Sequence, residues 1–241
     1  MSESEIVLYD LASKHGKAWS LNPWKTRMVL NYKSIPYRTH FLEYPDLAPT
    51  LLSLGIPPNP KSTPGYAADY TSPAVRYADG TYGMDSWPIA HTLETQYPEP
   101  SLHLEDPIVV QVRDAIMQLF VPLRAHLIPK VPGVLSERSQ EYFYRTRRER
   151  FGRPLQEVGA EAGEAEWETA RKPAEMMGDM LRRNGGPFFL GDKVSYADVI
   201  FVTALHCFKC VEEELFTKLV ALDPAFSKIY EASKQWLEKD D

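Results

Sequence analysis

The stretch SPAVRYADGTYGMDS at residues 72–86 decides how the first half of the chain is interpreted. Ser72-Pro73-Ala74-Val75 predicts a short strand opened by a proline, a residue type accepted at strand edges and the one that most often adopts a cis peptide bond. Asp79-Gly80 lies between two apolar runs, which is the strongest short-range signal for a β-hairpin. The second strand is expected at Thr81–Met84. Asp85-Ser86 then suits a helix start, where free backbone N–H groups attract negative charge.

Towards the N-terminus, segments with strand and helix patterns alternate. Ile6–Tyr9 (IVLY) is a short apolar run typical of a buried strand, and Tyr37–Glu43 alternates as a strand does. Residues 55–65 carry four prolines and predict an irregular loop. Helices are expected at 23–33, where Pro23 suits a first turn, at 46–54 and at 86–97. The order over about 97 residues is β-α-β-α-β-β-α, the arrangement of a thioredoxin-like α/β domain.

Beyond a proline-rich linker at 97–107, the pattern changes to long helical segments. Helices are expected at 108–127, 137–150, 161–183, from 194 onward and at 223–238. Pro122 is expected to kink or interrupt the first of them. The apolar face of the third is expected to hold Trp167, Met176, Met177 and Met180. We therefore predict a thioredoxin-like domain at 1–98 and an all-helical domain at 107–241.

The composition limits the class of protein. The 241 residues carry a net charge of −6, which argues against a nucleic-acid binder. We interpret the basic run RTRRER at 145–150 as a solvated helix face. The first ten residues, MSESEIVLYD, lack the basic and apolar regions of a signal peptide, and no apolar run approaches the ~20 residues that cross a bilayer. Two cysteines suit a reducing compartment better than a disulfide framework, so we expect a cytoplasmic protein that binds neither nucleic acid nor membrane.

The loop before the first expected helix is the next candidate site. A helix N-terminus at this turn stabilises a thiolate, and redox proteins of this arrangement place Cys-x-x-Cys there. This chain has Ser20 instead, within WSLNPWK at 19–25. A serine hydroxyl cannot be a redox centre, but it can donate a hydrogen bond to a bound thiolate; alternatively, Ser20 only caps the helix. Cys207-x-x-Cys210 lies inside an apolar helical pattern, and we interpret it as buried core rather than as a metal site.

Together these features resemble the cytosolic glutathione transferase superfamily over essentially the whole chain. The segment WSLNPWKTRMVLNYKSIPYRTHFLEYPDL at 19–47 is similar to the fungal etherase-like (FuA-type) class, which has an active-site serine. The Ser195-x-x-Asp198 box resembles a structural segment of the helical domain in that superfamily. Two features depart from the family pattern. Ser72 stands where valine or leucine is more usual, and the proline-rich loop at 55–65 is long.

The resemblance implies glutathione as co-substrate or cofactor, with Ser20 as the catalytic residue that hydrogen-bonds its sulfur. It implies that Asp85 pairs with the γ-glutamyl ammonium and that Ser86 binds the γ-glutamyl carboxylate, although either residue alternatively just caps a helix. The backbone of Ser72, next to Pro73, is expected to pair with the cysteinyl part of glutathione. The Ser72 hydroxyl either touches the ligand or is only tolerated.

A further group must hold the glycyl carboxylate of glutathione. Lys61, in the proline-rich loop, is the first candidate, with His40 and Lys25 behind it. The alternative is that Lys61 is an ordinary solvated loop lysine. Asn22 and Trp19 border the proposed thiol site and are expected to shape it, although Trp19 alternatively belongs to the core.

The family resemblance implies a second substrate, a small hydrophobic electrophile bound by the helical half. Aromatic candidates for that pocket, each alternatively part of the core, are Phe120, Tyr142, Tyr144, Trp167 and Phe208. Attack by the thiolate would give a conjugate or cleave an ether. The alternative, found in some superfamily members of fungal secondary metabolism, is cis–trans isomerisation of a double bond by reversible addition. A non-catalytic ligand carrier and a structural module are the interpretations outside catalysis, and the resemblance also implies a homodimer.

Overall fold

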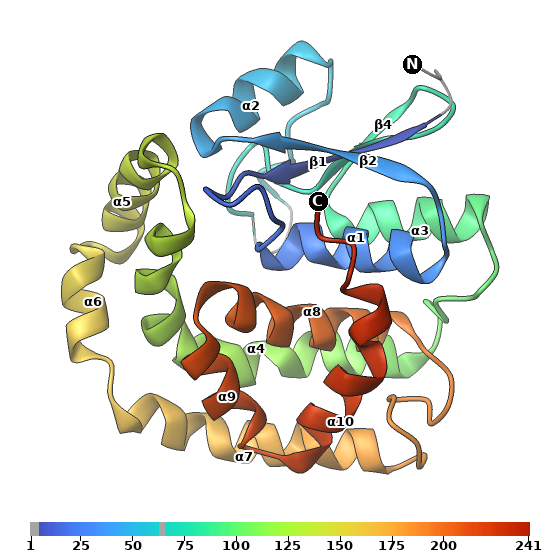
Figure 1. Cartoon of the computed structure of the whole chain (residues 1–241), viewed down its shortest axis with the longest axis vertical. Helices are drawn as coiled ribbons and strands as arrows, with labels where there is room; N and C mark the ends of the chain where they lie inside the picture. Colours follow the sequence, from blue (N-terminus) through green and yellow to red (C-terminus); the bar gives the residue numbers. More distant parts are fainter. Residues whose placement is uncertain (1–4, 63–65) are drawn as a thin grey trace.

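The computed structural model describes residues 5–62 and 66–241. Its first part is built on a four-stranded sheet with the order β2-β1-β3-β4 (Figure 1). The strands are β1 (Ile6–Leu11), β2 (Tyr37–Leu42), β3 (Ala74–Arg76) and β4 (Tyr82–Met84). β1 and β2 are parallel, whereas β3 is antiparallel to both β1 and β4. The predicted hairpin is therefore formed, and it supplies one edge of the sheet.

The sheet has helices on both faces (Figure 1). α1 (Leu21–Tyr32) and α3 (Ser86–Gln96) cover one face, and α2 (Tyr44–Ser53) covers the other. Successive side chains of a strand point to opposite faces, so Leu8 joins the core beneath α1, while Val7 joins the core beneath α2. β1 is buried on both faces as a result, as its apolar run predicts.

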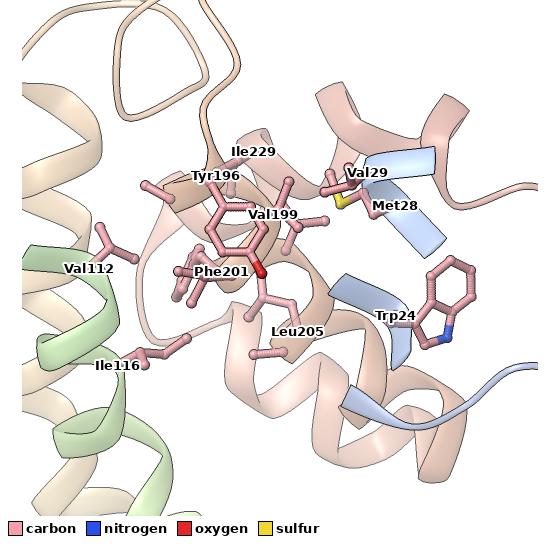
Figure 2. Packing of buried hydrophobic residues seen from close by; sticks show 14 of the residues in the cluster. Trp24, Met28, Val29, Val112, Ile116, Tyr196, Val199, Phe201, Leu205 and Ile229 are labelled. Carbon is pink, nitrogen blue, oxygen red and sulfur yellow. The ribbon is translucent and has the colours of Figure 1, made fainter. Parts of the chain in front are cut away.

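The second part of the chain is entirely helical. Its helices are α4 (Pro107–Leu127), α5 (Glu137–Phe151), α6 (Leu155–Glu161), α7 (Glu164–Arg182), α8 (Tyr196–Val211), α9 (Glu213–Val220) and α10 (Pro224–Ser233), with 3-10 turns η1 (Ile128–Val134) and η2 (Lys234–Trp236). α8 is apolar nearly all round and packs between α1 and α4, which is the behaviour expected of a central helix. Figure 2 shows Trp24 of α1, Ile116 of α4 and Leu205 of α8 in one shared core.

This architecture confirms the predicted combination of a thioredoxin-like α/β domain and an all-helical domain. The domain limits at 1–98 and 107–241 stay a prediction. Over residues 5–62 and 66–241, no helix is both long and apolar enough to cross a membrane.

Three local predictions differ from the structure in part. The helix expected at 161–183 is formed as α7, but it begins at Glu164, because the backbone is extended at Ala162 and Gly163. Met176 is 48% exposed rather than on the apolar face of α7. Pro122 does not interrupt α4, which runs unbroken to Leu127; a kink at this residue stays a prediction.

Residues 236–241 return from the helical part to the sheet and α1 (Figure 1). The Arg27 guanidinium forms an ion pair with Asp10 at 3.0 Å, and both side chains are fully buried. Arg27 also donates to the main-chain oxygen of Asp241 at 2.8 Å, and Thr39 donates to the same oxygen at 2.7 Å. A buried charge must be paired and hydrogen-bonded to be tolerated, and residue 241 supplies one of the acceptors of Arg27, although the buried Nε of Arg27 has no partner among the described residues.

Candidate functional site

A cavity of about 510 Å³ lies between the two parts of the chain. Trp19, Ser20 and Asn22 line it from the start of α1, and Tyr44 lines it from the start of α2. The remaining wall comes from α4, η1, α5 and α8. The cavity therefore lies between the loop of Ser20, the predicted site of the thiol, and the helices of the second half, the predicted site of an apolar substrate.

Ser20 is the N-cap residue of α1 and has extended backbone torsions. Its carbonyl accepts from the Trp24 N–H at 3.1 Å, which begins the helix, but its hydroxyl makes no capping hydrogen bond. The side chain is half-buried and faces the cavity. The hydroxyl thus lies at the positive end of a helix dipole, uncommitted to the first turn of the helix.

Lys25 connects this end of the cavity to the start of α3. Its ammonium donates to the Asn22 side-chain oxygen at 3.0 Å, and both residues line the cavity. Burial lowers the pKa of Lys25, and the Asp85 carboxylate opposes that shift. The Asp85 carboxylate is therefore close enough to act on the charge of Lys25. Lys25 also bonds to Asn22, two residues after Ser20.

Asp85 and Ser86 begin α3. Asp85 is the N-cap and accepts from the Trp87 N–H at 3.3 Å, as the capping alternative expects. Its φ of 76° is nevertheless in the region that non-glycine residues rarely occupy, and such residues concentrate at functional sites. Ser86 is buried, and its carbonyl accepts from the Tyr196 hydroxyl of α8 at 3.2 Å. The helical part thus fixes the start of α3.

Ser72 and Pro73 are joined by a cis peptide bond directly before β3. The Pro73 carbonyl accepts from the Asp85 N–H at 3.0 Å, which holds the two candidate segments together. The buried Ser72 hydroxyl donates to the Tyr9 carbonyl at 3.1 Å. That hydroxyl is engaged inside the protein, which favours the interpretation that it is tolerated rather than a ligand contact.

The three residues proposed to bind the glycyl carboxylate lie in different parts of the structure. Lys61 is exposed, and residues 63–65 of its loop lie outside the described part of the chain. His40, on β2, stacks on Tyr9 with ring centroids 5.5 Å apart. Of the three candidates, Lys25 is the one among the residues that line the cavity.

The aromatic candidates from the helical half divide in the same way. Phe120 and Phe208 line the cavity. Trp167 is buried against His126 in the core, Tyr142 stacks on Tyr44, and Tyr144 is exposed. Sequence reasoning missed Tyr44 and Phe143, which contact each other in the cavity wall across about 100 residues of chain.

Cys207 was predicted to be ordinary core, and it is buried, but it also lines the cavity. The Leu21 backbone N–H, in the first turn of α1, donates to its sulfur. Burial raises the pKa of Cys207 to about 12, so the thiol stays neutral at physiological pH. The sequence did not predict that Cys207 lines the cavity, because Cys207 lies far from α1 along the chain.

The interpretation of RTRRER as a solvated helix face holds for the exposed Arg145, Arg148 and Arg150, whereas Arg147 is half-buried. Arg147 and Arg150 of α5 line the cavity together with Arg124 of α4. The Arg147 guanidinium lies over the Phe143 ring, 4.1 Å from its centroid. The available signal was the spacing of 147 and 150, which places both residues on one side of a helix.

Two family descriptions match the chain. Residues 19–96 match the glutathione S-transferase N-terminal domain, and residues 111–238 match the glutathione S-transferase C-terminal domain. The glutathione S-transferase-like protein ustS of Aspergillus flavus is 37% identical over 98% of this chain and 92% of its own length.

Solved fungal structures are similar over nearly their full length. Glutathione transferase GSTFuA2 of Phanerochaete chrysosporium is 29% identical, with a TM-score of 0.87 over 98% of this chain and 99% of that one. The glutathione S-transferase CsGST63524 of Ceriporiopsis subvermispora, solved in complex with glutathione, is 31% identical, with a TM-score of 0.76 over 93% of this chain and 97% of that one. With its sheet, its helical half and the cavity between them, the chain belongs to the glutathione S-transferase family.

Proposed function

We propose that this protein activates the thiol of glutathione with Ser20 for attack on a hydrophobic electrophile. The protein is a glutathione transferase-type enzyme, and glutathione is its co-substrate. The observation that carries the mechanism is the Ser20 hydroxyl, which faces the cavity at the N-terminus of α1 without a capping bond. Glutathione supplies the thiol nucleophile, and residues of the protein bind glutathione and favour ionisation of its thiol.

The first step is ionisation of the thiol. Ser20 donates a hydrogen bond to the sulfur, and the dipole of α1 favours negative charge at the same place. The proton leaves to solvent. Lys25, a few residues along the same helix, adds a positive charge at the cavity wall. Each of these effects favours the thiolate over the thiol and lowers the pKa of the thiol below its ordinary value of about 8.5.

Asp85 and Ser86 hold the γ-glutamyl end of glutathione in this proposal. The exposed Asp85 carboxylate pairs with the ammonium, and the N-terminus of α3 receives the carboxylate. The backbone of Ser72 beside Pro73 pairs with the cysteinyl part, Asn22 shapes the thiol site, and Lys61 holds the glycyl carboxylate. Because Lys25 lies on the cavity wall, it is the alternative to Lys61.

The thiolate then attacks an electrophile seated against the apolar wall that includes Phe120 and Phe208. In substitution, a carbon–sulfur bond forms and the leaving group departs with its electron pair; an aryloxide leaving group makes this ether cleavage. Isomerisation would share the attack but would return glutathione after rotation about a single bond. Measuring glutathione consumption with each kind of substrate separates the two reactions.

Calorimetric titration of glutathione into the wild type and Asp85→Asn tests the site. Asparagine keeps an oxygen that can cap α3 and accepts a positive φ, so the change removes mainly the charge. A charge-assisted contact is worth about 1.5 to 3 kcal/mol, so its loss is expected to lower the affinity for glutathione by about tenfold or more.

Asp106→Asn is the matched control. Asp106 caps α4 in the same manner, accepting from the Ile108 N–H at 2.9 Å. Neither Asp85 nor Asp106 lines the cavity, but Asp85 is the carboxylate that acts on the pKa of Lys25 in the cavity wall. It is expected to leave glutathione affinity unchanged. A wild type that does not bind glutathione, or equal losses in both variants, contradicts the proposed site.

A further inference from the structure

Four cationic side chains line the cavity. Lys25 comes from α1, Arg124 from α4, and Arg147 and Arg150 from α5. None of the described residues that line this cavity is an aspartate or a glutamate. The rest of the wall is mainly apolar, so the cavity presents concentrated positive charge beside hydrophobic surface.

Two other arginines on this side of the molecule have carboxylate partners. Arg145 pairs with Glu149, and Arg153 pairs with Glu161. Within residues 5–62 and 66–241, by contrast, no carboxylate lies at ion-pair distance from Arg124, Arg147 or Arg150. The pKa of Arg124 is lowered mainly by burial and also by the positive charge of Arg150. Like charges held close together without a counter-ion destabilise one another, and an anion between them would remove that repulsion.

Arg147 is held in one orientation. Its guanidinium lies over the Phe143 ring and 5.7 Å from the Tyr44 centroid, and it bonds to the hydroxyl of Tyr44 and to that of Thr146. A stacked guanidinium keeps its planar fork of donors available at the edge, and this fork matches a carboxylate. Preorganised donors of this kind lose little entropy when an anion binds.

We propose that the electrophilic substrate is an amphipathic organic acid, whose anionic group is bound by Arg124, Arg147 and Arg150 while its apolar part contacts Phe120 and Phe208. This deepens the proposed function, because it defines which hydrophobic electrophiles the cavity selects. Neutral analogues of the same shape would lose the contact with the arginines and bind more weakly.

A pair of fluorescent probes tests the inference without requiring turnover. 8-Anilinonaphthalene-1-sulfonate and N-phenyl-1-naphthylamine share their rings and differ by the sulfonate. Both are titrated into the wild type, Arg124→Gln/Arg150→Gln and Arg148→Gln, in saturating glutathione and without it. Arg147 is left intact, because its stacking on Phe143 is part of the cavity wall. Arg148 is exposed on the same helix and is not among the lining residues, so it controls for general surface charge.

The wild type and Arg148→Gln are expected to prefer the sulfonate by about tenfold or more, as for a charge-assisted contact. The double variant is expected to lose that preference while binding of the neutral probe stays within about twofold. Displacement of the sulfonate by 1-naphthoate and by 1-naphthyl phosphate then ranks carboxylate against phosphate, and methyl 1-naphthoate is the neutral comparison.

Equal affinity of the wild type for both probes overturns the inference, and so does an equal loss of preference in Arg148→Gln. A preference that saturating glutathione abolishes also overturns it, because the arginines would then serve the carboxylates of glutathione. Calorimetry with glutathione on the same samples keeps the two proposals apart. A protein that binds the sulfonate selectively but not glutathione refutes the proposed function, whereas the reverse result refutes only this inference.

Discussion

Replacing Ser20 by alanine separates its chemical role from a structural one. Because the Ser20 hydroxyl makes no capping hydrogen bond, its removal is expected to lower stability by less than the ~1 kcal/mol of an ordinary cap. A hydrogen bond to a charged group is worth about 1.5 to 3 kcal/mol, which corresponds to about 1 to 2 pKa units. The pKa of bound glutathione is therefore expected to rise by that amount in Ser20→Ala, while the α1 dipole continues to favour the thiolate.

The assay is the pH dependence of thiolate absorbance in the glutathione complex, measured together with the rate of attack on a chlorodinitrobenzene-type electrophile. At a pH below the pKa of the wild-type complex, the rate is expected to fall by about 10- to 100-fold. Above the pKa values of both complexes, the two rates should converge, because the thiol is ionised with or without the hydroxyl. A pH profile with an unchanged midpoint, or a loss of rate that is the same at every pH, would refute the thiolate role.

Ser136→Ala provides the contrast. Ser136 is the N-cap of α5, and its hydroxyl accepts from the Ser139 N–H at 3.3 Å and donates to Glu43 at 2.6 Å. Its loss is expected to cost about 1 kcal/mol or more of stability, by chemical denaturation, without moving the pKa of bound glutathione. The two variants are thus expected to differ. Ser136→Ala lowers the stability of the protein, whereas Ser20→Ala raises the pKa of the bound thiol.

Three further predictions concern the helical half. Burial lowers the pKa of His206 to about 4, so the native protein binds fewer protons than the unfolded chain between about pH 4 and 6.5; stability should fall by about 3 kcal/mol as pH drops through that window, and urea titrations of His206→Phe should show a smaller fall. In Gly178→Ala, the new Cβ would meet the Asp223 carboxylate at 2.1 Å, so the melting temperature should drop by an amount equivalent to about 1 to 3 kcal/mol, and an unchanged melting temperature would contradict the packing. Native Cys207 should resist alkylation by iodoacetamide at pH 8 because its thiol is neutral, and rapid labelling of the folded protein, seen by mass spectrometry, would contradict its burial.

The order of strands and helices could be predicted because local chemistry sets it. Asp79-Gly80 specifies the hairpin, and Asp85 marks the start of α3, whatever the rest of the chain does. The limits of helices were less certain where the signal was weak. The break between α6 and α7 depends on two residues, Ala162 and Gly163, inside a segment that otherwise has a helical composition.

The cavity wall could not be predicted in full, because it depends on contacts between distant parts of the chain. Cys207 meets Leu21, and Phe143 meets Tyr44, only after α8 and α5 have packed against the first half. A run of arginines on a helix carries no local sign of what it faces, so the charge of Arg147 and Arg150 was assigned to solvent. Burial and partners decide such a case, and both are properties of the packed fold.

The contacts of Arg27 with the last residues have a consequence for the timing of folding during synthesis. Asp10 and Arg27 leave the ribosome more than 200 residues before Asp241, whose main-chain oxygen accepts a hydrogen bond from Arg27. Until then, the buried guanidinium lacks the acceptor that Asp241 provides, and an incompletely paired buried charge is costly. The first half of the chain therefore reaches its final stability only after Asp241 has been synthesised. Since domains generally fold as units in the order of their synthesis, this chain departs from that order, because a buried ion pair of its first half needs a residue that follows the helices of its second half.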